Sequence, residues 1–172
     1  MKFLRRPECS AWLDGQNWPD SPYGKPHPAT TSYLQFAVPK RHGATLQIVD
    51  AIRACLQATQ DCLFQVTDWS RFVPDLENPV LNSLEATCSG QLPQFDAVGV
   101  LFVAGETNVM LECCKVVLDC GMSAYLYVPH VATFYLWEGD LIDFWSDDVR
   151  QIETIEAWLT REQINVTSRH TG

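Results

Sequence analysis

Residues 133–148 read TFYLWEGDLIDFWSDD, two short segments of alternating side chains joined by the turn sequence Glu138-Gly139-Asp140. Glycine adopts the positive φ that a tight connection requires, so the stretch predicts a β-hairpin. Side chains alternate between the two faces of a strand. If the aliphatic side chains of the hairpin point into the core, a second set of side chains lies on the opposite face of the hairpin. That set, called the hairpin face below, is Tyr135, Trp137, Asp143 and Trp145.

The hairpin face has two interpretations. Exposed clusters of large aromatic residues are rare on monomeric proteins, so the N-terminal arm or the final helix is expected to cover the face. If the face is accessible, it resembles an interaction surface, since Trp and Tyr dominate binding hot spots. Acidic side chains nearby would then select a basic partner. They are Glu138, Asp140, Asp147 and Asp148.

Periodic apolar patterns on both sides of the hairpin predict alternating strands and helices. Strands are expected at residues 33–38, 62–67, 97–103 and 123–128, and helices at 44–58, 78–90, 106–119 and 147–160. Such alternation is typical of parallel strands joined by right-handed crossovers, whereas a short loop requires an antiparallel hairpin. The sequence therefore predicts an α/β fold: a mixed, mostly parallel sheet with helices on both faces and the C-terminal antiparallel hairpin at one edge.

The domain organisation follows from composition and length. Residues 1–31 hold five prolines with interleaved Trp and Tyr, and proline at this density blocks helices and ladders. We expect residues 1–31 to form an extended arm packed on the body. A single α/β domain is expected at 32–165 and a flexible tail at 166–172. The length of 172 residues suits one hydrophobic core.

Composition also restricts the partners. The net charge of −9 argues against nucleic-acid binding through a broad basic surface. No apolar run reaches the roughly 18 residues of a membrane span, and the start lacks the apolar core of a secretory signal. Seven cysteines without a CxxC pair are typical of buried thiols in a reducing compartment. We therefore predict a cytoplasmic protein with no nucleic-acid or membrane partner.

A second candidate site follows from the expected parallel sheet, because ligands bind at the carboxyl ends of parallel strands. Loops at that edge contain side chains suited to anion binding or acid–base chemistry. These crevice residues are His42, Asp68, Arg71, Glu106 and His130. The chain has no nucleophile elbow, phosphate-binding loop or dinucleotide fingerprint. No catalytic residue, metal site or cofactor is predicted.

Two functions stand as hypotheses. The preferred one is a non-enzymatic, acidic protein-binding module, of the kind seen in inhibitors and immunity proteins, that uses the hairpin face. Its expected partner is a basic protein or a second copy of the chain. The alternative is an enzyme or a small-ligand or anion binder that uses the crevice residues. The lack of catalytic spacing favours the first.

Overall fold

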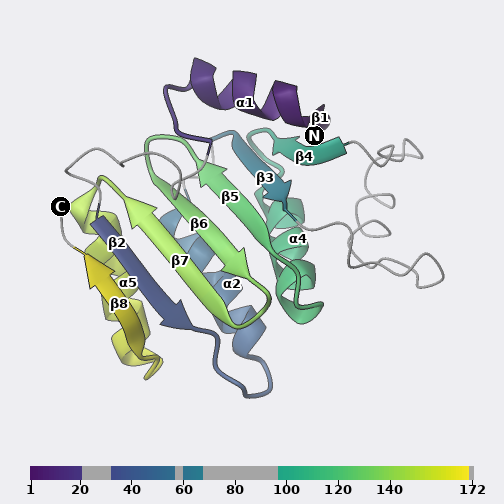
Figure 1. Cartoon of the computed structure of the whole chain (residues 1–172). Coiled ribbons are helices and arrows are strands. Elements are labelled where there is room, and N and C mark those ends of the chain that lie inside the picture. Colours follow the sequence, from purple (N-terminus) through teal and green to yellow (C-terminus); the bar gives the residue numbers. More distant parts are fainter. Residues whose placement is uncertain (21–31, 57–59, 68–96, 171–172) are drawn as a thin grey trace.

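The computed structural model describes residues 1–20, 32–56, 60–67 and 97–170 (Figure 1). The strands of this part form one sheet in the order β1-β4-β3-β5-β6-β7-β2-β8. The strands are β1 (Lys2–Arg5), β2 (Ser32–Ala37), β3 (Cys62–Val66), β4 (Ala97–Phe102), β5 (Ala124–Val128), β6 (Ala132–Trp137), β7 (Leu141–Ser146) and β8 (Val166–His170). The helices are α1 (Arg6–Gly15), α2 (Ala44–Cys55), α4 (Thr107–Asp119) and α5 (Val149–Arg161).

The prediction of a mostly parallel sheet is wrong, because every neighbouring pair of the described strands is antiparallel. The hairpin is also not at an edge, since β6 and β7 lie between β5 and β2 near the middle of the sheet.

One cause of the error is that other strands lie between those that α2, α4 and α5 connect; in addition β3 and β4, expected to be parallel, are antiparallel neighbours. Helix α2 connects β2 to β3, which run in the same direction, but β7, β6 and β5 separate them. In the same way α4 connects β4 to β5 across β3, and α5 connects β7 to β8 across β2. Each helix thus joins strands of one direction without making them neighbours.

The main hydrophobic core lies between the sheet and the helices α2, α4 and α5, which stand behind the strands in Figure 1. Alternate strand residues point into this core, as the period of two requires. Phe134 and Phe144 lie opposite each other on the hairpin and their rings are 4.9 Å apart. Both side chains are fully buried, so the aliphatic side of the hairpin is held by the helices.

Helix α1 covers one end of the opposite side of the sheet. Its Cys9 and Leu13 pack with Leu63 and Tyr127 in a second, smaller core. Gly99 of β4 permits this approach, since a Cβ atom there would lie 2.7 Å from the sulfur of Cys9. The side of the sheet that carries the hairpin face therefore has α1 over β1 and β4, and none of the other described helices.

The ends of the chain differ from expectation. Residues 1–31 were expected to form an extended arm, but β1 and α1 occupy residues 2–15. Pro7 lies in the first turn of α1, where its missing N–H group costs no helical hydrogen bond. Residues 166–170, expected to be a flexible tail, form β8. The remainder of the arm at 21–31 and the helix expected at 78–90 lie outside the described residues.

None of the described helices is long and apolar enough to cross a membrane.

Candidate functional site

The hairpin turn fixes the register of the hairpin face. Glu138 and Gly139 have φ values of 51° and 72°, and the Asp140 N–H donates to the Trp137 carbonyl at 2.9 Å. Two successive positive φ values are those of a type I′ turn, whose twist matches that of the strands. Gly139 also touches the end of α4, because a Cβ atom there would lie 2.6 Å from the Leu118 carbonyl oxygen. The turn is therefore anchored to the helix layer.

The neighbouring strands enlarge the hairpin face on both sides. Asp143 lies between Tyr135 on β6 and Gln35 on β2 in the register of the sheet. Tyr125 of β5 lies opposite Tyr135. The sheet thus places polar and aromatic side chains of four strands in one continuous area.

Asp143 is the buried centre of a polar network. Its side chain is completely buried, and Oδ1 accepts hydrogen bonds from the Tyr33 hydroxyl at 2.7 Å and from Nε2 of Gln35 at 2.8 Å. The Oε1 atom of Gln35 in turn accepts from the Thr167 hydroxyl at 2.9 Å. A buried carboxylate is tolerated only with such donors. This network joins β7, β2 and β8.

The environment of Tyr33 keeps it a hydrogen-bond donor. Burial, the hydrogen bond to Asp143 and the negative charge of Asp143 all raise the pKa of the Tyr33 hydroxyl above its ordinary value. The hydroxyl therefore stays protonated at neutral pH. Trp145 lies against the Tyr33 ring at a centroid distance of 5.3 Å and is 6% exposed. Asp143 and Trp145 accordingly belong to the packed part of the hairpin face.

The other part of the hairpin face belongs to a row of rings, here called the aromatic ladder: Tyr127, Tyr125, Tyr135 and Trp137. Successive ring centroids are 5.3, 4.3 and 5.7 Å apart along the ladder. Tyr127 is fully buried, the next two tyrosines are half-buried, and Trp137 is 40% exposed. The ladder thus begins beneath α1 and ends in an exposed indole next to the hairpin turn.

The structure covers one part of the hairpin face and leaves another part exposed. Helix α5 lies with the main core on the other side of the sheet, so it does not cover this face. Part of the N-terminal region does lie there: Nε1 of Trp18 donates to the Thr133 hydroxyl at 2.9 Å, and the Tyr127 hydroxyl donates to the Asp20 carbonyl at 2.7 Å. Packing accounts for the covered part, and Trp137 is left at the surface.

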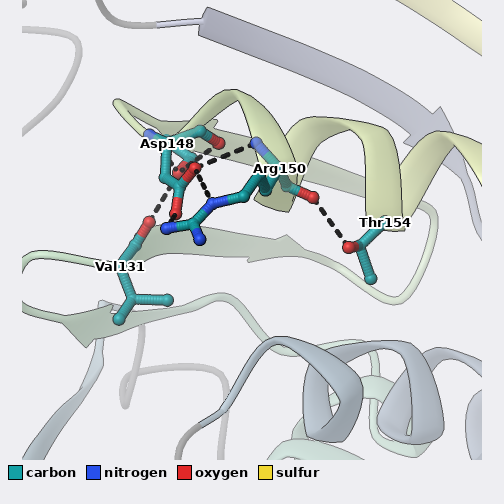
Figure 2. Close-up of polar contacts among 5 residues, drawn as sticks. Val131, Asp148, Arg150 and Thr154 are labelled. Atoms are coloured by element: carbon teal, nitrogen blue, oxygen red, sulfur yellow. Dashed lines mark hydrogen bonds and ion pairs between the residues drawn. The ribbon is translucent and has the colours of Figure 1, made fainter.

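The acidic residues near the hairpin face are partly neutralised within the chain. Asp140 forms an ion pair with Lys40. Figure 2 shows Arg150 folded back on Asp148, with its NH2 group 2.9 Å from Oδ2. The hydrogen bonds from the Arg150 side chain and backbone hold the pKa of Asp148 below its usual value. Asp148 also caps α5 by accepting from the Arg150 N–H. The local negative charge is thus smaller than the sequence indicates.

Among the described crevice residues, the structure separates His42 from Glu106 and His130. His42 follows the end of β2, at the same end of the sheet as the hairpin turn. Glu106 and His130 lie at the opposite end, beyond β4 and in the turn between β5 and β6. Asp68 and Arg71 lie outside the described residues. Because neighbouring strands are antiparallel, the shared carboxyl edge on which this site depended does not exist in the described sheet.

Glu106 has a structural role in this arrangement. Its Oε1 accepts from the Met1 amine at 2.5 Å, and its Oε2 accepts from the Val103 N–H at 2.9 Å. Burial raises its pKa, but these two hydrogen bonds and the ammonium charge outweigh burial and leave the pKa below its usual value. The carboxylate is therefore engaged in closing the loop after β4.

The described cysteines are packing residues. All of them but Cys120 are buried. Burial raises the pKa of Cys55 and of Cys62 to about 12, which keeps these thiols neutral. Within the described ranges no group of three or more His, Cys, Asp or Glu side chains is arranged to hold a metal ion.

Sequence reasoning missed Tyr33, Gln35 and Tyr125 as members of the site. The alternation of β2 does separate Leu34 and Phe36 from Tyr33 and Gln35, so a signal for their face was present. No local pattern shows that β2 pairs with β7, and only that pairing brings Gln35 next to Asp143.

Comparison of the chain with protein-family models, with curated proteins and with solved structures gives no match.

Proposed function

We propose that the protein is a non-enzymatic binding module that binds a basic protein through the exposed end of the hairpin face. The observation that carries this proposal is the aromatic ladder, which ends in Trp137 at 40% exposure. Trp and Tyr are enriched among the residues that dominate binding interfaces, and clusters of exposed apolar side chains often mark interaction sites. Asp143 and Trp145 then serve as the support of this surface.

The rigidity of the ladder supports binding by Trp137. Its ring lies 5.7 Å from that of Tyr135, which stacks on Tyr125 at 4.3 Å. All these residues lie on paired strands, so little side-chain or backbone freedom remains for a partner to restrict. A preorganised indole beside a tight turn is the type of residue that acts as an anchor in protein interfaces.

Charge supports a basic partner. Residues 132–172 contain eight acidic and three basic side chains, and the whole chain has a net charge of −9. Lys40 and Arg150 offset two of the carboxylates near the hairpin face. We therefore expect charge to act mainly through the field of the whole molecule, raising the association rate more than the affinity. Most of the described cysteines are buried, as is typical of thiols in a reducing compartment, and on this ground we propose a cytoplasmic location.

Photo-crosslinking from position 137 tests the proposal. A benzoylphenylalanine at 137 should capture a basic protein in the producing cell, and the same group at Leu46, which is 53% exposed on α2, should not. With that protein purified, Trp137→Ala should lower the affinity by at least about tenfold in calorimetric titration.

The matched control is Leu46→Ala, which removes a comparable exposed apolar side chain from the helix layer and should leave the affinity unchanged. Equal capture from positions 137 and 46, or an affinity that Trp137→Ala does not alter, would contradict the proposed function.

A further inference from the structure

Trp137 stands apart from the other exposed apolar side chains of the described part of the chain. The large ones lie on other elements: Leu46 on α2, Val103 after β4, Val149 on α5 and Val166 on β8. An apolar anchor in an interface is normally surrounded by further contacts that exclude water. The indole of Trp137 is therefore better suited to a partner group that binds a single ring than to a broad apolar contact.

The hairpin turn places a carboxylate near this ring. A β-turn holds its first and fourth Cα atoms within about 7 Å, and these are the Cα atoms of Trp137 and Asp140, whose N–H donates to the Trp137 carbonyl. The Asp140 side chain is 63% exposed, and the side chain of its ion-pair partner Lys40 is 75% exposed. Ion pairs at such exposure contribute little to stability, so another cation can take the place of Lys40.

The geometry of the aromatic ladder leaves the indole available to a cation. Tyr125 and Tyr135 stack with an angle of 25° between their rings, whereas the rings of Tyr135 and Trp137 are tilted by 51°. A tilted contact covers less of a ring face than a stacked one. The face of an aromatic ring carries partial negative charge, and indole attracts cations more strongly than the rings of Tyr and Phe.

We infer that the basic partner contributes an arginine, whose guanidinium stacks on Trp137 and pairs with Asp140 in place of Lys40. The inference rests on the proposed function and names the group that this surface recognises. Arginine fits better than lysine, because its planar and weakly hydrated guanidinium stacks on a ring while its N–H groups donate to a carboxylate. The net charge of −9 on the chain attracts such a group.

Two peptides of equal charge test the choice of arginine. Acetylated and amidated hexaarginine should bind the full chain about threefold more tightly than hexalysine in calorimetric titration, which is the size of one exposed cation–π contact. Trp137→Leu keeps an apolar side chain but removes the ring, so it should remove most of that preference. Trp137→Phe should retain a part of the preference, and the control Leu46→Ala should leave it intact.

The variant Lys40→Gln tests the exchange at Asp140. It removes the cation that competes with the peptide and should strengthen the binding of hexaarginine about twofold more than the control Lys2→Gln does. Lys2→Gln makes the same change of charge on β1, which three strands separate from β6. The comparison therefore separates the local exchange from the general field of the molecule.

Four results would overturn the inference: no measurable binding of hexaarginine, equal affinity for the two peptides, a preference that survives Trp137→Leu, or equal effects of the two lysine variants. These results leave the proposed function standing, because a basic protein that holds Trp137 in an apolar pocket would still be captured from position 137. Equal capture from positions 137 and 46 alongside a clear arginine preference would contradict the proposed function and not the recognition of arginine.

Discussion

Replacement of Asp143 with Ala is expected to lower the free energy of unfolding by about 3 kcal/mol. The carboxylate is fully buried and accepts hydrogen bonds from Tyr33 and Gln35. Its removal leaves the half-buried hydroxyl of Tyr33 and amide of Gln35 without this acceptor, and an unsatisfied group costs about 1–3 kcal/mol where it is fully buried. Urea denaturation followed by circular dichroism measures the change.

Two further variants give the control for Asp143. Tyr33→Phe removes one donor and should cost about 1 kcal/mol, and the double variant should show that the two losses are not additive. Asp140→Ala removes an exposed carboxylate paired with Lys40 and should change stability by less than about 0.5 kcal/mol. If Asp143→Ala costs no more than Asp140→Ala, the buried network does not support the hairpin face.

Replacement of Gly139 with Ala is expected to lower the free energy of unfolding by about 3 kcal/mol. The residue has a φ of 72°, and its added Cβ would lie 2.6 Å from the Leu118 carbonyl oxygen. Both the left-handed conformation and the contact with the end of α4 oppose a side chain. Because the turn sets the register of β6 and β7, the change also disturbs the aromatic ladder. Thermal and urea unfolding measure the loss.

Gly43 provides the matched control. Its φ is 80°, but a Cβ atom there has nothing within 4 Å, so Gly43→Ala tests the conformational cost alone, at about 1 kcal/mol. The difference between the two variants isolates the contact between the hairpin turn and α4. Equal losses at the two positions would show that the turn is not held against Leu118.

Local patterns predicted much of the secondary structure but not the order of the strands. The period of two in the hairpin correctly separated the core residues Phe134 and Phe144 from Tyr135 and Trp145. The alternation of strands and helices correctly gave β2 and β3 one direction, and likewise β4 and β5, but it was wrong for β3 and β4, which are antiparallel neighbours. The alternation carried no information on which strands lie between two strands joined by a helix. That order depends on pairing between segments that are far apart in the sequence.

The candidate site was also predictable only in part: its local pattern could be predicted, but its long-range contacts could not. All four members of the hairpin face are on one side of the sheet, and the turn at Gly139 has the expected backbone. The sequence did not predict that Asp143 and Trp145 are buried while Trp137 is exposed. The burial of the first two depends on the pairing of β2 with β7. Tyr33 and Gln35 reach Asp143 only through that long-range pairing.

Acrylamide quenching of tryptophan fluorescence tests the central claim most directly, because a binding surface at Trp137 requires an accessible indole in the free protein. Trp137→Phe should remove a strongly quenched component, whereas Trp145→Phe should leave that component in place, in line with exposures of 40% and 6%. If Trp137 proves as shielded as Trp145 in the monomeric protein, the whole hairpin face is covered and the proposed binding surface is wrong.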